Sequence, residues 1–125
     1  MHIRSSAPHL IVKDLQRSVE FFVEVLGFER PALWGEPPEF AMPQRDGFIV
    51  MLELARDSAS RAHGDVGSWD AYFWIDGVDD YADALRSHGA EIVEGPVDRP
   101  EYGMRELTVR DPDGHWLVFA EDTGS

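Results

Sequence analysis

The chain contains an internal repeat, and this repeat limits the folds that it can adopt. The apolar run that ends near Val12 recurs near Ile75, an offset of 63 residues, and the turn Asp46-Gly47 recurs as Asp113-Gly114, an offset of 67. The four-residue difference falls in loops. Two units are too few for a solenoid, in which stacked neighbours cover each other. We therefore expect each unit to cover one face of a sheet with its own helix.

The first unit begins with the strand-length apolar run 9–12, followed by Asp14, a residue that commonly caps helix N-termini. Gly27 predicts the end of the helix in a left-handed conformation, with Phe28 packing behind it. Between the two ends, apolar residues recur at helical spacing: Leu15, Val19, Phe22 and Leu26.

The Pro-rich stretch 31–43 predicts irregular structure or an edge strand, because proline cannot donate to a sheet ladder. Asp46-Gly47 then predicts a hairpin that leads into a buried strand over 48–53. The following segment, 55–68, is polar and rich in small residues, so we expect a surface connection between the two units.

The second unit repeats this order, with a strand predicted over 71–75 and a helix whose N-cap is expected at Asp79. Two further strands are expected at 105–110 and 116–120. They are joined by residues 111–114, Asp-Pro-Asp-Gly, which are strong turn formers.

Alternation along the expected strands separates two sheet faces. One set is uniformly apolar and is expected to face the helices: Leu10, Val12, Val50, Leu52, Phe73, Ile75, Leu107, Val109, Leu117 and Phe119. The opposite set mixes aromatic, apolar and ionisable side chains: His9, Ile11, Ile49, Met51, Glu53, Asp70, Tyr72, Trp74, Glu106, Thr108, Arg110, Trp116 and Val118. Such a mixture suits a ligand pocket better than open solvent.

The chain is acidic, with 24 Asp and Glu against 11 Lys and Arg and a formal net charge of -13. This charge repels phosphate backbones and anionic lipid, so neither nucleic acid nor a membrane is an expected partner. No run approaches the roughly 20 apolar residues of a membrane span, and no secretory leader pattern is present, which predicts a cytoplasmic location. The lack of cysteine excludes thiolate metal sites and cysteine nucleophiles.

Several motifs, taken together, resemble the vicinal-oxygen-chelate superfamily, which includes glyoxalase I, bleomycin-resistance proteins, fosfomycin-resistance enzymes and extradiol dioxygenases. They are Val12-Lys13-Asp14-Leu15 with Ser18, Phe21-Phe22, Leu26-Gly27-Phe28, Tyr102-Gly103-Met104-Arg105-Glu106 and Arg110-Asp111-Pro112-Asp113-Gly114-His115. The resemblance covers nearly the whole chain.

This resemblance implies an α+β fold in which two βαβββ modules form a curved, partly open mixed β-barrel with the helices on the outer face. Residues 1–125 would form one domain, with module one at about 6–54, the connection at about 55–68 and module two at about 69–122. The resemblance also implies a ligand site in the concavity and, commonly, a homodimer.

The resemblance further implies where metal-dependent relatives place their ligands, mostly His or Glu. The corresponding residues here are Ala7, Met51, Asp70 and Val118. Only Asp70 offers a hard donor, whereas a catalytic site of this kind needs about three protein ligands. We therefore expect no metal and no cofactor.

A shifted metal site built from His9, Glu53 and Asp70 is the alternative. His9 and Glu53, however, each lie two residues from the family position, roughly 6–7 Å along a strand. That displacement is far larger than metal coordination tolerates.

We therefore expect a small-molecule-binding protein that sequesters a cationic or aromatic ligand, possibly an antibiotic, without metal. The residues predicted to bind it are His9, Trp34, Phe40, Met51, Glu53, Asp70, Tyr72, Trp74, Glu106, Trp116 and Val118. Acidic groups would attract the cation, and the aromatic rings would stack on it.

Other interpretations stay open. The aromatic residues would equally suit a core or a dimer interface, and Glu106 would equally pair with Arg105, Arg110 or another base. A metal-dependent lyase, isomerase or dioxygenase is the alternative activity. Metal-free catalysis with His9 or Asp70 as the base is a third.

Overall fold

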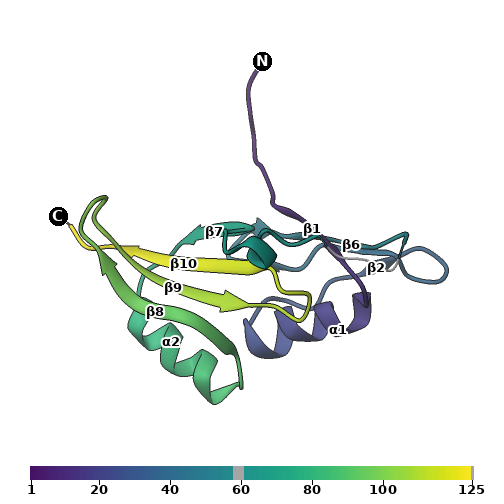
Figure 1. The fold of residues 1–125 in the computed structure, drawn as a ribbon. Coiled ribbons are helices and arrows are strands. Elements are labelled where there is room, and N and C mark those ends of the chain that lie inside the picture. The colour runs from purple at the N-terminus through teal and green to yellow at the C-terminus, as the bar shows by residue number, and fades with distance from the viewer. Residues whose placement is uncertain (58–60, 125) are drawn as a thin grey trace. The chain divides into compact units, whose positions relative to one another are not determined.

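The computed structural model describes residues 1–57 and 61–124, and the chain divides into two compact units, Met1–Ala62 and His63–Ser125. Each unit holds a four-stranded sheet in which parallel and antiparallel pairs are mixed, together with one α-helix (Figure 1). The α+β class expected from the sequence is confirmed. No helix in the described ranges is both long and apolar enough to span a membrane.

The sheet of unit 1 has the strand order β1-β6-β3-β2, and a separate two-stranded ladder pairs β4 with β5. In chain order the elements are β1 (His9–Val12), α1 (Leu15–Glu20), the π-helical turn η1 (Phe21–Val25), β2 (Leu33–Trp34), β3 (Phe40–Ala41), β4 (Gln44–Arg45), β5 (Phe48–Ile49) and β6 (Met51–Leu54).

The helical segment of unit 1 begins and ends where the sequence predicts. The Asp14 side chain accepts a hydrogen bond from the Arg17 N–H at 3.0 Å, which satisfies one of the free amides of the first turn. Gly27 follows the last turn with φ +81°. Phe28 then packs edge-on against Phe22, with ring centroids 5.2 Å apart.

The single strand predicted over 48–53 is wrong, because it is interrupted at Val50. The first part pairs with β4, whereas Met51–Leu54 pairs with β1 and β3. The Val50 N–H donates instead to the Pro43 carbonyl at 3.0 Å, so the chain changes ladder at this residue. The Pro-rich stretch supplies the short strands β2 and β3.

Unit 2 is a complete βαβββ module with the strand order β7-β10-β9-β8. Its elements are a 3-10 turn, η2 (His63–Val66), then β7 (Ala71–Trp74), α2 (Val78–Ser87), β8 (Glu91–Arg99), β9 (Met104–Arg110) and β10 (Trp116–Asp122). Figure 1 shows α2 on one side of this sheet.

The N-cap predicted at Asp79 is wrong, because α2 begins at Val78 and its N-cap is Gly77, two residues earlier than predicted. The Glu121 carboxylate accepts hydrogen bonds from the Gly77 and Val78 N–H groups at 3.0 and 3.1 Å, and these bonds lower the pKa of Glu121. Asp79 instead pairs with Arg105 at 2.9 Å. A cap supplied from β10 has no local sequence signal.

The internal repeat is confirmed by strand register. Leu10 pairs with Leu52 in the parallel β1–β6 ladder, and Phe73 pairs with Phe119 in the parallel β7–β10 ladder. These partners are related by the same offsets of 63 and 67 residues that the sequence shows. The two units therefore pair their first and last strands in equivalent registers.

The apolar face of each sheet forms its core, as alternation predicted. Ten residues were expected there, and eight of them are buried: Leu10, Val12, Val50, Leu52, Leu107, Val109, Leu117 and Phe119. Phe73 and Ile75 are partly buried. Among the described residues, the opposite face of each sheet carries no α-helix of its own unit, and we call it the helix-free face.

A buried histidine–aspartate pair holds the turn between β9 and β10. Asp111 accepts hydrogen bonds from the Asp113 and His115 N–H groups, and its other oxygen lies 2.7 Å from Nδ1 of the buried His115 ring. Burial alone lowers the pKa of His115, but the hydrogen bond and the charge of Asp111 outweigh it, so the pKa is raised. The imidazolium form is thus favoured by folding.

Replacing His115 by Gln is expected to remove a pH-dependent part of the stability. A raised folded-state pKa stabilises the protein below the unfolded value of about 6.5 and ceases to do so as pH rises through the folded value. Urea unfolding from pH 5.5 to 9 should show the wild type about 2 kcal/mol more stable than the variant at low pH, with the difference shrinking at high pH. His2→Gln, in the exposed N-terminal segment, is the control; a difference that grows with pH would contradict the account.

Candidate functional site

The helix-free face of unit 1 carries the five ligand residues that the sequence predicts in that unit. Strand pairing forms one row across all four strands: Ile11, Glu53, Phe40 and Trp34. His9 pairs with Met51 in the neighbouring row. Residues paired in this way share a sheet face. Alternation predicted this face for His9, Met51 and Glu53, and the pairing of β2 and β3 adds Trp34 and Phe40 to it.

His9 and Glu53 interact on this face. The His9 Nε2 lies 2.9 Å from a Glu53 carboxylate oxygen, and both side chains are partly exposed. Glu53 is therefore a solvent-accessible acid with a titratable neighbour. A small hollow of about 240 Å³ adjoins it, lined by Ile11, Glu53, Leu54, Ala55, Arg56, Asp57 and Arg61.

Trp34 and Phe40 lie side by side at the other edge of the same face. Their ring centroids are 5.9 Å apart, and Trp34 is 47% exposed. The β2–β3 pairing brings these rings together. The Pro-rich segment thus supplies an exposed aromatic wall beside the Glu53 carboxylate.

The helix-free face of unit 2 carries a continuous row of aromatic rings. Ring centroids are 4.9 Å apart between Trp69 and Tyr72, and 5.0 Å apart between Tyr72 and Trp74. Trp74 is 75% exposed and Trp69 is 44% exposed. We call Trp69, Tyr72 and Trp74 the aromatic row. Trp69 was not predicted as a site residue, because it precedes the predicted strand and so has no alternation signal.

Glu106 lies beside the aromatic row and is only 3% exposed. One carboxylate oxygen accepts hydrogen bonds from the Tyr72 hydroxyl at 2.7 Å and the Tyr102 hydroxyl at 2.9 Å. The other lies 3.3 Å from the Arg99 Nε. Arg99 also binds Glu94. Glu106 thus pairs with a base other than Arg105 or Arg110, which form ion pairs with Asp79 and Glu91 respectively.

This cluster fixes the protonation of Tyr72. Burial, followed by the hydrogen bond to Glu106 and its charge, raises the pKa of the Tyr72 phenol well above its usual range. The shift favours the protonated hydroxyl, which is the form that donates to Glu106. Arg99 was not predicted from the sequence as a site residue. Tyr102 was noted there as part of a family motif and not as a ligand-binding residue.

Asp70 acts as an internal hydrogen-bond acceptor. Its side chain, 5% exposed, accepts from three backbone N–H groups, those of His63 at 2.7 Å, Gly64 at 3.1 Å and Trp116 at 2.8 Å. These bonds tie the turn η2 to the first residue of β10. The carboxylate is thus directed at the backbone of its own unit.

Trp116 and Val118 occupy the helix-free side of β10. Val118 pairs with Tyr72 and is fully buried. The Trp116 indole packs against Gly64, where an added Cβ would lie 2.4 Å from the ring. Its Nε1 is buried and has no hydrogen-bond partner in residues 1–57 and 61–124.

The residues at the positions where the family resemblance implies metal ligands do not fit a metal ion. Ala7, Met51 and Val118 carry no hard ligand atom, and the Asp70 oxygens are engaged by three amides. Across the described ranges, no cluster of three or more His, Asp or Glu is arranged to hold an ion. The His9, Glu53 and Asp70 alternative gains no support, because Asp70 faces its own backbone.

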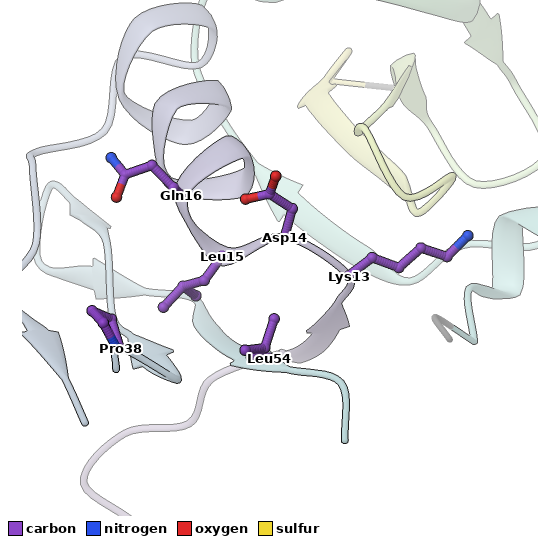
Figure 2. A pocket seen from close by; sticks show the side chains of 6 residues that line it. All are labelled: Lys13, Asp14, Leu15, Gln16, Pro38 and Leu54. Atoms are coloured by element: carbon purple, nitrogen blue, oxygen red, sulfur yellow. The ribbon is translucent and has the colours of Figure 1, made fainter. Parts of the chain in front are cut away.

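A larger hollow of about 350 Å³ lies at the start of α1 (Figure 2). It is lined by Lys13, Asp14, Leu15, Gln16, Pro38 and Leu54. Figure 2 shows Lys13 and Gln16 extending in opposite directions, and Asp14 serves as the cap of α1. Because its polar groups do not converge, this hollow lacks what a specific ligand site requires.

The sequence model of the glyoxalase/bleomycin resistance protein/dioxygenase superfamily matches residues 2–119 of the chain. The chain belongs to this superfamily. YraH, an uncharacterised protein of Bacillus subtilis (strain 168), is 30% identical over 118 residues, which span 87% of this chain and 90% of YraH.

Solved structures share the fold of this chain. TioX from Micromonospora sp. ML1 is 28% identical with a TM-score of 0.72, covering 95% of this chain and 98% of TioX. TnmS3, an antibiotic-binding protein from Streptomyces sp. CB03234, is 22% identical with a TM-score of 0.74, covering 97% of each chain. The likeness to TnmS3 shows a common fold alone.

Asp70→Ala is expected to destabilise the protein by about 2–4 kcal/mol, because three backbone amides lose a charged acceptor. Urea unfolding measures the change in the free energy of unfolding. Asp65→Ala, an exposed carboxylate in the same turn, is the matched control and should change stability by no more than about 0.5 kcal/mol. Equal stabilities of the two variants would show that Asp70 does not hold this turn.

Proposed function

We propose that this protein binds a cationic or aromatic small molecule, an antibiotic among the candidates, on the helix-free faces of its sheets, without a metal ion. The aromatic row carries the proposal. A soluble protein rarely exposes large rings in a continuous row without a use for them, and here two tryptophans flank a tyrosine whose hydroxyl is held in place.

The charge of the chain favours a cationic ligand. The formal net charge is -13, and Glu53 on unit 1 and Glu94 beside Arg99 on unit 2 are acids with exposed oxygens. An aromatic face attracts a cation by about 0.5–2 kcal/mol per ring. Flat cationic compounds therefore suit both the aromatic rings and the negative electrostatic potential of the protein.

Two comparisons support binding over chemistry. TnmS3, with the same fold, binds antibiotics, so this fold accommodates such ligands. The metal-dependent activities of the superfamily need an ion, and the donors at the relevant positions here do not suit one. The proposal requires no bond to be broken, and chelation with EDTA should leave ligand affinity unchanged.

A homodimer in the cytoplasm completes the proposal. Large rings such as Trp74 would be partly covered by a second copy, which would form one wall of each ligand groove. Light scattering of the purified protein should give a mass about twice the 14.1 kDa of one chain. A mass equal to one chain would remove the second copy from the account.

Trp74→Ala is expected to weaken binding because it removes the most exposed ring of the aromatic row. Loss of one stacking or cation–π contact of about 0.5–2 kcal/mol raises Kd about two- to thirtyfold. Calorimetry against bleomycin and a panel of aromatic and cationic antibiotics measures the affinities, first on the wild type and then on the variant.

Phe48→Ala is the matched control, since Phe48 is an equally exposed ring (71%) in the separate β4–β5 ladder. Its affinities should equal those of the wild type. If no compound in the panel binds the wild type, or if both variants lose affinity equally, the proposed function is wrong.

A further inference from the structure

The hydroxyl of Tyr72 has a fixed direction because its proton has only one acceptor. A phenol carries one proton, and the Tyr72 oxygen lies 2.7 Å from a Glu106 oxygen. A carboxylate can only accept, so Tyr72 must be the donor in this pair. The remaining hydrogen-bonding capacity of the Tyr72 oxygen is therefore that of an acceptor.

Arg99 and Tyr102 hold Glu106 in this role. Arg99 can only donate, and its Nε lies 3.3 Å from the second carboxylate oxygen. Tyr102 donates to the same oxygen as Tyr72, at 2.9 Å. All three neighbours of Glu106 thus donate to it.

Of the two tyrosines, Tyr72 is the one whose ring belongs to the aromatic row, so its oxygen is the one beside a ligand stacked there. Within the part of the chain that the structure describes, no group donates to the Tyr72 oxygen. Its ring lies between Trp69 and Trp74, about 5 Å from each. A flat molecule stacked on this row would have its edge next to an oxygen that can only accept.

We propose that Tyr72, oriented by Glu106, makes the aromatic row selective for ring compounds that carry an N–H donor at their edge. The chemical class is that of aromatic amines, amidines and N–H heterocycles, rather than rings bearing only carbonyl or ring-nitrogen acceptors. Glu106 is a positioning residue, since it acts through Tyr72. This inference rests on the proposed function, because it presupposes that ligands stack on the row.

Glu106→Gln tests the orientation directly, because it should reverse the Tyr72 hydroxyl. Since Arg99 only donates, the glutamine carbonyl must face Arg99, which turns its NH₂ group towards the two phenols. Tyr72 then accepts from the glutamine, and its own proton becomes free for a ligand. The variant should prefer ligands that carry an acceptor.

The probes are indole, which offers an N–H donor, and quinoline, a flat ring system of similar size that offers only an acceptor. Titration followed through the indole N–H signals of Trp69 and Trp74 by NMR gives both Kd values. The wild type should bind indole about fivefold more tightly than quinoline, the worth of one neutral hydrogen bond. In Glu106→Gln, the ratio of the quinoline Kd to the indole Kd should fall below one.

Two variants separate orientation from charge and from misfolding. Asp98→Asn removes one negative charge from β8, where Asp98 pairs with Arg105, and leaves the contacts of Glu106 with Tyr72 and Arg99 intact, so its ratio should equal that of the wild type. Tyr72→Phe keeps the ring and removes the hydroxyl, so the ratio of its quinoline Kd to its indole Kd should fall to the value that stacking alone gives.

The inference is overturned if wild type, Glu106→Gln and Tyr72→Phe give the same ratio while both probes bind. In that case Trp74→Ala would still weaken both probes, and the proposed function would stand. If neither probe perturbs the Trp69 and Trp74 signals of the wild type, the inference and the proposed binding surface both fail.

Discussion

Among the described residues, each unit has one α-helix for a four-stranded sheet, so this helix covers one face of the sheet and leaves the other face without an α-helix. A sheet buries apolar side chains on a face only where another layer covers it. In unit 2, α2 covers the side of Leu107, Leu117 and Phe119, which are buried. The other side carries the aromatic row, Glu106 and a small buried apolar cluster of Met104, Val118 and Ala120, against which Tyr72 packs. That composition leaves a surface suited to a ligand.

The acidity of the chain has two different uses. Several acids act as internal acceptors for backbone N–H groups: Asp14, Asp70, Asp111 and Glu121. These carboxylates fix helix starts and turns and are committed to the backbone. Glu53 and Glu94, in contrast, keep exposed oxygens on or near the helix-free faces. The bonds to the backbone leave the charge of each carboxylate unchanged, so the whole set contributes to the negative potential, whereas Glu53 and Glu94 can also contact a ligand directly.

The sequence predicted what depends on local chemistry or on alternation. Asp14 as a cap and the assignment of residues to sheet faces need only neighbours along the chain, and the offsets of the repeat recur between the parallel pairs of the two units. Contacts between distant segments carried no such signal. Glu121 caps a helix that begins 43 residues earlier. Arg99 lies on β8, a strand that polar residues and Gly95-Pro96 make hard to recognise in the sequence. Whether the predicted residues bind a ligand stays a prediction.

We propose that ligands bind on the helix-free faces, against the exposed rings, and not through a metal ion. The decisive measurement is a crystal structure of the protein with an aromatic cationic compound that calorimetry shows to bind. We expect the compound to stack on Trp74, with a donor group near the Tyr72 hydroxyl. A compound seated in the hollow beside Lys13, or a cation coordinated by three or more side chains, would show that this proposal is wrong.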